Sequence, residues 1–442
     1  MAERYLNLVG GEWVPAKNGE FFENRNPARW DDVVGLFPAS GAADVDAAVA
    51  AATAAFRTWR LVPAPKRAEI IYRAGEILRS RKEELARDMT REMGKVIAET
   101  RGDVQEAIDC AYFTAGEGRR MYGDTTPAEL PDKMALSIRC PIGVAALITP
   151  WNFPMAIPSW KAFPALVTGN TIVLKPATET PLSSYHLVKV LEEAGMPPGV
   201  VNLVCGGGAS CGQPLAEHRD VGVVSFTGSS AVGKLLAQAT GRSLKRLSLE
   251  LGGKNAQVVM DDADIDLAIE GALWGAFGTT GQRCTATSRL ILHQPIAAEF
   301  TKRLVAAAGR ITIGDGLDAG IQMGPTISEK QRQTVQDYVD IGRKEGATLL
   351  LGGAPLLTGA HAGGWFYPPT IFGDVTPRMR IAQEEIFGPV LSILTVDSFE
   401  EAIDVLNGTV YGLSSSIYTR DVNRAMRAIR DIEAGITYIN GP

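Results

Sequence analysis

Residues 143–175 read GVAALITPWNFPMAIPSWKAFPALVTGNTIVLK, and this stretch decides the fold class. It contains two short β-rich runs, at residues 144–149 and 171–174, with a helical segment at residues 159–166 between them. A strand, a helix and a second strand in this order are typical of a βαβ unit, whose strands lie side by side in a buried parallel sheet. The stretch therefore predicts an α/β protein.

The same alternation continues toward the C-terminus. Further β-rich runs lie at residues 200–204, 221–226, 257–260 and 289–293. Helical segments separate them at residues 182–194, 231–239 and 263–279. Two successive α/β domains are the simplest interpretation.

The N-terminal side has a different pattern. The first forty residues are rich in turns and predict edge strands or hairpins, and helical patterns follow at residues 44–60, 66–93 and 101–121. The pattern at 66–93 is amphipathic, with apolar residues at helical spacing among charges. Residues 124–141 contain two prolines before a run with period-two alternation, which predicts a protruding ribbon rather than a core strand.

Composition limits the class of function. The chain has 442 residues, of which 45% are hydrophobic and 21% charged, so it is long enough for several domains and apolar enough to be compact throughout. A net charge of -6 argues against a general binder of nucleic acid or of an anionic membrane. The five cysteines show no metal-ligand spacing and are too sparse for a disulfide framework, so we predict no metal and a reducing compartment. Without a leader-like apolar segment at the N-terminus, a cytoplasmic location is the simplest expectation.

Two residues have the chemistry of a nucleophile and a base. Cys284 lies among small polar residues after the helical segment, beside Arg283, where a partly exposed thiolate is favoured; an inert buried cysteine is the alternative. Glu250 ends an apolar strand before Gly252-Gly253, where burial would make its carboxylate a stronger base; a surface glutamate is the alternative. The four histidines lie in ordinary helical or loop contexts, so a carboxylate suits this thiol better as a partner.

Other polar residues follow predicted strands. Asn152 lies in a turn stiffened by Pro150 and Pro154, where its amide is either a fixed donor to an oxyanion or part of an Asx turn. The remaining candidates are Lys175 at a strand end, Gly228 and Ser229 at a helix start where phosphate binds, and the acids Glu384 and Glu385 before a turn. Each has an ordinary structural alternative when taken alone.

Taken together and in order, seven motifs carry a resemblance: TPWNFP, KPATETP, FTGSSAVGK, LELGGKN, GQRCTA, EEIFGPV and YGLSSSIYTRD. This set resembles the NAD(P)-dependent aldehyde dehydrogenase superfamily and spans the chain from Gly10 to Asn440. The resemblance implies a Rossmann-like cofactor domain at residues 1–123 and 142–251, a catalytic domain at 252–442 and an oligomerisation β-ribbon at 124–141. Members of the superfamily continue past the equivalent of Pro442 with a final strand, so we expect this chain to be truncated.

The resemblance also implies a mechanism. Cys284 would attack the aldehyde carbon, with the Asn152 amide and the Cys284 backbone N–H stabilising the oxyanion. After hydride transfer to the nicotinamide, Glu250 would activate water to hydrolyse the thioester. Relatives that transfer the acyl group to coenzyme A lack this glutamate, so a hydrolytic enzyme is expected.

For the cofactor, the resemblance assigns Lys175 and Thr178 to the adenosine ribose, Gly228 and Ser229 to the pyrophosphate, and Glu385 and Phe387 to the nicotinamide end. Trp151 would line the adjoining wall. Many members that use NAD alone carry glutamate where this chain has Thr178, so NADP is expected to be tolerated or preferred.

The substrate is less defined. The sequence GQRCTATSRL is similar to that of members acting on semialdehydes with a distal carboxylate, such as 2-oxoglutarate semialdehyde. We assign Arg283, as a cationic binder of the tail, and Phe153 to the substrate; a structural arginine paired with a helix is the alternative. Open alternatives for function are a generic aliphatic or aromatic aldehyde dehydrogenase, a catalytically impaired family member and a cofactor-independent thiol esterase. A homodimer or homotetramer is expected.

Overall fold

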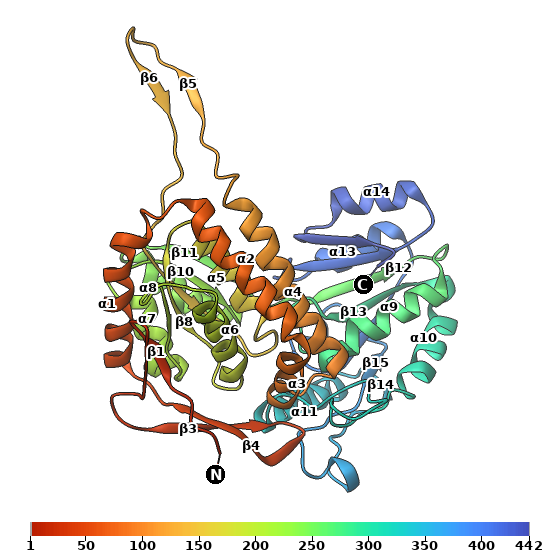
Figure 1. The fold of residues 1–442 in the computed structure, drawn as a ribbon. Helices are drawn as coiled ribbons and strands as arrows, with labels where there is room; N and C mark the ends of the chain where they lie inside the picture. The colour runs from red at the N-terminus through yellow and green to blue at the C-terminus, as the bar shows by residue number, and fades with distance from the viewer. Residues whose placement is uncertain (1, 442) are drawn as a thin grey trace. The chain divides into compact units, whose positions relative to one another are not determined.

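The computed structural model describes residues 2–441, which form two compact units (Figure 1). Unit 1 comprises the described residues up to Arg25, then Val33–Glu92 and Ala98–Glu250. Unit 2 comprises Asn26–Asp32, Met93–Ile97 and the described residues from Leu251 onward. The predicted cofactor domain included the two short segments that group with unit 2, whereas the ribbon groups with unit 1.

The core of unit 1 is a seven-stranded sheet in the order β11-β10-β7-β8-β9-β1-β2. Its strands are β1 (Asn7–Val9), β2 (Glu12–Val14), β7 (Val144–Ile148), β8 (Thr171–Lys175), β9 (Val201–Leu203), β10 (Val221–Thr227) and β11 (Arg246–Glu250). Strands β7 to β11 are parallel to one another, while β1 is antiparallel to both β2 and β9. Every residue of β7 and β8 is buried, as expected for a parallel sheet covered on both faces. The predicted strands are therefore found, and the α/β class is confirmed.

Eight helices belong to unit 1 within the described residues. They are α1 (Ala42–Trp59), α2 (Ala64–Ser80), α3 (Lys82–Met93), α4 (Ile97–Glu117), α5 (Ala156–Val167), α6 (Pro181–Glu193), α7 (Gln213–Glu217) and α8 (Ser230–Gly241), with a π-helical turn at Gly208–Gly212. Helix α1 packs on β8 and β9, and α5 on β7 and β8. The pattern at residues 66–93 belongs to two helices, because Arg81 leaves the helical conformation at φ -106° and ψ 12° and ends α2.

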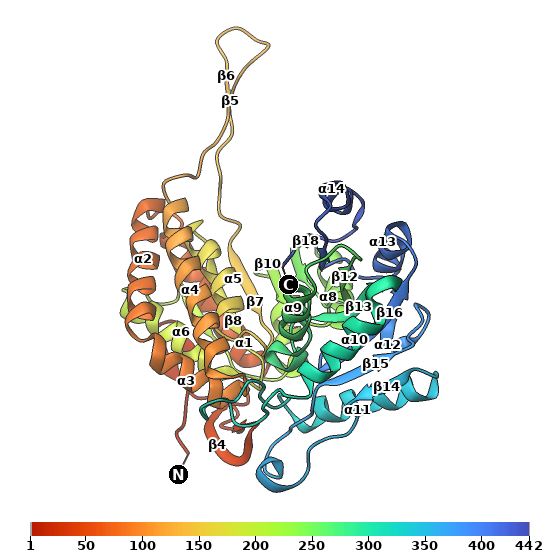
Figure 2. The same cartoon turned by 90° about the vertical axis from the view of Figure 1, so that its right-hand side faces the viewer.

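Two hairpins lie outside this sheet. Strands β3 (Phe21–Asn26) and β4 (Arg29–Pro38) form one pair, and β5 (Thr125–Pro127) and β6 (Met134–Leu136) form the other. The second pair is a long ribbon that extends away from the helices of unit 1 in both views (Figures 1 and 2). Its apolar side chains Leu130, Met134, Leu136 and Ile138 are exposed.

Unit 2 contains a second seven-stranded sheet, in the order β14-β15-β16-β13-β12-β17-β18. Its strands are β12 (Asn255–Val259), β13 (Thr287–His293), β14 (Thr348–Leu351), β15 (Thr370–Gly373), β16 (Val390–Val396), β17 (Ser414–Tyr418) and β18 (Ile436–Ile439). Only the pair formed by β14 and β15 is antiparallel. The helices are α9 (Ile265–Phe277), α10 (Gln294–Ala308), α11 (Glu329–Lys344), α12 (Arg380–Gln383), α13 (Phe399–Asn407) and α14 (Val422–Asp431).

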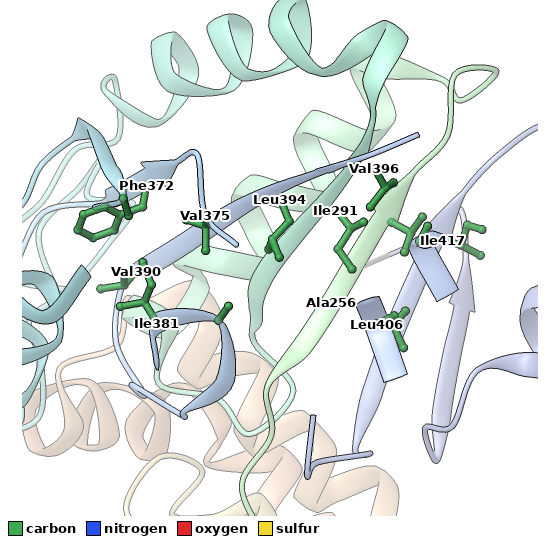
Figure 3. Close-up of a cluster of buried hydrophobic side chains, with 14 of the residues drawn as sticks. Ala256, Ile291, Phe372, Val375, Ile381, Val390, Leu394, Val396, Leu406 and Ile417 are labelled. Carbon is green, nitrogen blue, oxygen red and sulfur yellow. The ribbon is translucent and has the colours of Figure 1, made fainter. Parts of the chain in front are cut away.

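The unit 2 sheet is packed on an apolar cluster contributed by strands, helices and loops far apart in the sequence (Figure 3). Labelled members are Ala256, Ile291, Phe372, Val375, Ile381, Val390, Leu394, Val396, Leu406 and Ile417. Helix starts around this core are capped by side-chain oxygens: Asp264 accepts from Leu267 N, Ser328 from Gln331 N and Ser398 from Glu401 N. The core and caps fix the loops on which the unit 2 candidates lie.

Candidate active site and cofactor residues

The unit 1 candidates emerge at one edge of the parallel sheet. The ladder pairs Ile148 with both Lys175 and Phe226, and Thr227 with Glu250. Four strand ends are therefore neighbours: the end of β7 before the 149–154 turn, Lys175 on β8, the end of β10 before Gly228, and Glu250 on β11. Ligands of open α/β sheets bind outside the carboxyl ends of the strands, so this edge is the candidate site of unit 1.

The turn after β7 is firmly held. Asn152 is buried, with 2% of its surface exposed, and Trp151 and Phe153 are half-buried. Phe153 O accepts from Ile157 N at 3.1 Å, and Asp103 Oδ1, fully buried on α4, accepts from Ala156 N at 2.7 Å. The sequence prediction missed Asp103, which no motif identifies. A buried amide on a turn fixed from both sides is suited to stabilising a developing oxyanion.

Lys175 is buried at the end of β8. Its Nζ donates to Pro176 O at 2.6 Å and to Gly206 O at 3.0 Å, which leaves one of its three N–H donors for a ligand. Burial lowers the pKa of this lysine, and the nearby thiols of Cys211 and Cys205 raise it in part.

Thr178, three residues after Lys175, has an acidic partner. Its Oγ1 donates to Glu179 Oε2 at 3.0 Å, so a carboxylate lies beside the position from which NADP tolerance was predicted. The sequence prediction gave Thr178 a role in cofactor choice and gave Glu179, the next residue, none.

Gly228 and Ser229 form the start of α8. Gly228 N donates to Glu250 O at 3.0 Å, and a Cβ at Gly228 would lie 2.5 Å from the Phe226 ring, so only glycine fits. The Ser229 hydroxyl caps the helix by accepting from Val232 N at 3.4 Å. The N–H groups of this first turn are an anion site of the kind that holds pyrophosphate.

Glu250 is exposed, so its predicted burial is wrong. The physical reason is that β11 is an edge strand, and its exposed and half-buried residues alternate. Lys161 on α5, which the sequence analysis missed, lies within electrostatic range of Glu250 and donates from Nζ to Ser225 Oγ at 2.9 Å. Burial lowers the pKa of Lys161 to about 8, and Glu250 opposes this shift. The sequence feature that could have identified Lys161 is its place as a lysine within the otherwise apolar segment of residues 156–167.

In unit 2, Cys284 lies in a turn between α9 and β13. It is in no disulfide bond and is half-buried. Asn255 holds the turn: its Nδ2 donates to Cys284 O at 2.7 Å and to Ala286 O at 3.0 Å, and its Oδ1 accepts from Ser414 N at 3.1 Å. The preceding Thr279, Thr280 and Gly281 have φ of 53°, 58° and 68°. A half-buried thiol on a turn fixed in this way has the placement of a nucleophile rather than of an inert core cysteine.

Arg283 contacts the end of α9. Its Nη2 donates to Trp274 O at 2.8 Å and to Gly275 O at 3.0 Å, and its guanidinium lies 4.6 Å from the centre of the Trp274 ring. These contacts match the alternative of a structural arginine paired with a helix. Binding of a substrate tail would have to use the remaining edge of the guanidinium.

Glu385 and the Cys284 turn meet the same Gly-Gly turn. Glu385 Oε1 accepts from Gly253 N at 3.1 Å, and a Cβ at Gly252 would lie 2.0 Å from Glu385 Oε2. A Cβ at Gly253 would lie 2.6 Å from the backbone oxygen Cys284 O, so glycine is required at 253, whereas a side chain at 252 would displace the Glu385 carboxylate. Burial raises the pKa of Glu385, while the Gly253 N–H and Lys254 lower it.

Phe387 follows in a left-handed conformation, with φ of 57°. Gln331 on α11 stabilises it, since Nε2 donates to Ile386 O at 3.0 Å and to Phe387 O at 2.9 Å. Sequence analysis missed Gln331, which lies more than fifty residues before the loop it holds. The structure thus brings the unit 1 candidates together at a sheet edge, and Cys284 and Glu385 together at one turn of unit 2.

Two searches of residues 2–441 bear on other classes of function. No grouping of three or more His, Cys, Asp or Glu side chains there has the arrangement of a metal site. No helix in this range is both long enough and apolar enough to cross a membrane.

Comparison with known proteins shows extensive similarity. The sequence pattern of the aldehyde dehydrogenase family matches residues 13–442. Alpha-ketoglutaric semialdehyde dehydrogenase of Bacillus subtilis is 45% identical over 436 residues, covering 99% of this chain and 89% of the relative. The NADP(+) succinate-semialdehyde dehydrogenase GabD of Escherichia coli is 40% identical, covering 99% and 90%. The structure of betaine aldehyde dehydrogenase from Staphylococcus aureus in complex with NAD+ superposes with a TM-score of 0.98 at 33% identity, covering 99% of this chain and 87% of that one.

Proposed function

The chain belongs to the aldehyde dehydrogenase family and is an NAD(P)-dependent aldehyde dehydrogenase, and from this premise we propose which residues perform the reaction and on which substrate. Cys284 is the nucleophile, Asn152 stabilises the oxyanion and Glu250 is the base. The observation that carries the proposal is the Cys284 turn, where Asn255 holds the backbone of a half-buried cysteine beside Gly253, whose N–H also binds Glu385.

The residues present fit a dinucleotide. Lys175 retains a free donor beside the carbonyls of Pro176 and Gly206, which suits a ribose hydroxyl. The start of α8 at Gly228 and Ser229 suits a pyrophosphate, and the half-buried Glu385 carboxylate suits the hydroxyls of the second ribose. Thr178 would contact the adenosine side of a bound cofactor, and Trp151 and Phe387 would contact its nicotinamide end. When bound, NAD(P)+ accepts the hydride from the substrate carbon.

The residues of this chain then act in two stages. The Cys284 thiolate forms a bond to the aldehyde carbon, and the Asn152 amide and the Cys284 N–H bind the resulting oxyanion. Once the thioester has formed, Glu250 removes a proton from water, which attacks the acyl carbon and releases a carboxylic acid and the Cys284 thiol.

For the substrate we propose a semialdehyde with a distal carboxylate, such as 2-oxoglutarate semialdehyde. Relatives named for alpha-ketoglutarate semialdehyde are 45% and 43% identical to this chain. Phe153 would pack on the carbon chain, and Arg283 would attract the carboxylate. The contacts of Arg283 with Trp274 and α9 favour a second candidate, an enzyme for uncharged aldehydes.

The test is formation of reduced nicotinamide, followed by absorbance, with semialdehydes and uncharged aldehydes and with NAD and NADP in parallel. Cys284→Ala should lower the rate by at least about a thousandfold, and the exposed Cys140→Ala should not change it. Turnover that survives in Cys284→Ala would overturn the nucleophile. Ester hydrolysis that needs no cofactor, with no reduced nicotinamide formed, would support a thiol esterase instead.

Arg283→Gln separates the two substrate candidates. For a tail-binding arginine, KM should rise about tenfold or more for semialdehydes and stay unchanged for uncharged aldehydes. An equal change for both classes would mean that Arg283 only supports the end of α9.

We also propose a homodimer or homotetramer joined through the β5–β6 ribbon, whose exposed apolar side chains are the supporting observation, and a cytoplasmic location. Mass determination by light scattering tests the assembly. Met134→Asp with Leu136→Asp should shift it to monomer, and an unchanged mass would contradict the role of the ribbon.

A further inference from the structure

Lys254 is a buried lysine of unit 2 that the proposed mechanism does not use. It lies between the Gly252-Gly253 turn and β12, and only 1% of its surface is exposed. Its Nζ has no hydrogen-bond partner among the described residues. An ammonium in this position is unfavourable unless a nearby negative charge compensates it.

The charges that face Lys254 come from four segments. Arg289 on β13 donates to Lys254 O, Val405 O and Leu406 O at 2.9, 2.8 and 2.7 Å, so its positive charge is held by carbonyls and repels the lysine. Glu384 and Glu385 supply negative charge from the segment after α12. Tyr411 and Glu433 line a small cavity with Lys254, of about 10 Å³.

Glu384 and Glu385 are the two carboxylates that act on the charge of Lys254, and Glu385 is the one without another cationic partner. Glu384 is already engaged, because it accepts from Arg380 at 2.8 and 2.9 Å and from Tyr338 Oη at 2.8 Å. Glu385 forms no ion pair within residues 2–441, and its carboxylate accepts from the N–H of Gly253, the residue immediately before Lys254.

The two groups affect each other's protonation in opposite directions. Burial, and after it Arg289, lower the pKa of Lys254 to about 7, and Glu385 and Glu384 oppose this shift. Burial raises the pKa of Glu385, and the Gly253 N–H and then Lys254 lower it. Each charged form therefore favours the other.

We propose that Lys254 is a positioning residue for the nicotinamide end of the cofactor, because its buried ammonium keeps the Glu385 carboxylate ionised on the Gly253 amide. The inference rests on the proposed function, in which Glu385 binds the ribose hydroxyls. An ionised carboxylate accepts hydrogen bonds from hydroxyls more strongly than a protonated one. Lys254 acts through Glu385 and does not touch the cofactor.

The experiment measures binding of NADH to the full chain by nicotinamide fluorescence, from about pH 6 to about pH 9, in four proteins. These are the wild type, Lys254→Met, Glu385→Gln and the double variant, with the exposed Lys344→Met as a control for loss of a charge. In Lys254→Met, Kd should rise about tenfold near pH 6 and approach the wild-type value near pH 9, since bulk pH then ionises Glu385 without help. Glu385→Gln should weaken binding at every pH, and Lys254→Met should add nothing to it.

The outcomes separate the two levels of the proposal. If Glu385→Gln leaves Kd unchanged, Glu385 is not a cofactor ligand and that part of the proposed function fails. If Glu385→Gln weakens binding but Lys254→Met does not, or weakens it equally at every pH and additively with Glu385→Gln, the role of Lys254 is overturned. Should Lys254→Met fail to fold, Lys254→Gln gives the same comparison with a polar side chain in place of the ammonium.

Discussion

The two units hold their candidate residues by different means. In unit 1, Lys175, Gly228 and Glu250 lie at or next to the ends of parallel strands, whose register is set by a ladder of backbone hydrogen bonds. In unit 2, Cys284 and Glu385 lie on irregular backbone close to residues with positive φ. The side-chain amides of Asn255 and Gln331 hold this backbone by hydrogen bonds. A strand is held in place by many backbone hydrogen bonds, whereas the position of a loop depends on one or two side chains. Single substitutions away from the reacting groups should therefore damage the unit 2 site more.

The largest such effect is expected from Asn255→Ala, compared with Asn202→Ala in unit 1. Both asparagines are buried, and each makes three hydrogen bonds with backbone groups; those of Asn202 join Ile172 O, Gly199 O and Gly10 N. Each substitution should lower the free energy of unfolding by about 2–4 kcal/mol, measured in urea. Only Asn255→Ala should also lower kcat, by about a hundredfold, because it releases the Cys284 turn. An equal loss of kcat in Asn255→Ala and Asn202→Ala would contradict the proposed difference between the two units.

Gln331→Ala is expected to have the next largest effect. Loss of two hydrogen bonds to Ile386 O and Phe387 O would free the left-handed Phe387, and KM for the cofactor should rise about tenfold. Gln333→Ala, an exposed glutamine of the same helix that bonds Asp337, is the matched control and should leave KM unchanged. A similar rise in both variants would indicate damage to α11 rather than to the loop.

Lys161→Met tests a buried charge at the unit 1 sheet edge. The pKa of Lys161 falls from 10.5 to about 8 in the folded chain, so between these values the unfolded chain binds more protons and stability rises with pH. Below about pH 8 the folded chain carries the full free-energy cost of holding a charged Lys161 away from water. Removing this charge should stabilise the variant by about 1–3 kcal/mol near pH 7. The gain should vanish above the unfolded value of 10.5. Urea unfolding across pH measures it, with the exposed Lys66→Met as control; a gain that does not change with pH would contradict the assignment.

The smallest effect concerns cofactor choice. Glu179 accepts from Thr178, so if Thr178 binds the adenosine ribose as proposed, the Glu179 carboxylate should repel a 2'-phosphate. Glu179→Gln should raise kcat/KM for NADP relative to NAD about fivefold, and the exposed Glu193→Gln should not. An unchanged ratio would show that the Glu179 carboxylate does not face the adenosine ribose.

The parallel strands from β7 to β10, together with β12 and β13, were predictable because a strand buried on both faces needs a continuous apolar run, and the sequence shows such runs directly. Strands β14 to β17 of unit 2 were not predicted. The break at Arg81 was not predictable, since the apolar spacing continues through it while the backbone turns. The burial of Glu250 was predicted wrongly because strand position was clear from the sequence but the place of β11 at the sheet edge was not. Two separate alternatives for Arg283 were visible in the sequence, and only packing brought its guanidinium onto Trp274.

The sequence by itself determined the α/β class, the family and the chemistry-bearing residues, because apolar periodicity and ordered motifs are local properties of the chain. Only the tertiary structure decided what holds those residues: Asn255 on Cys284, Gln331 on Phe387, Gly253 and Lys254 on Glu385, and Glu179 beside Thr178. Many of these contacts join residues distant in sequence through single hydrogen bonds or buried charges. Their strength depends on distance and burial, and neither quantity exists before the chain is folded.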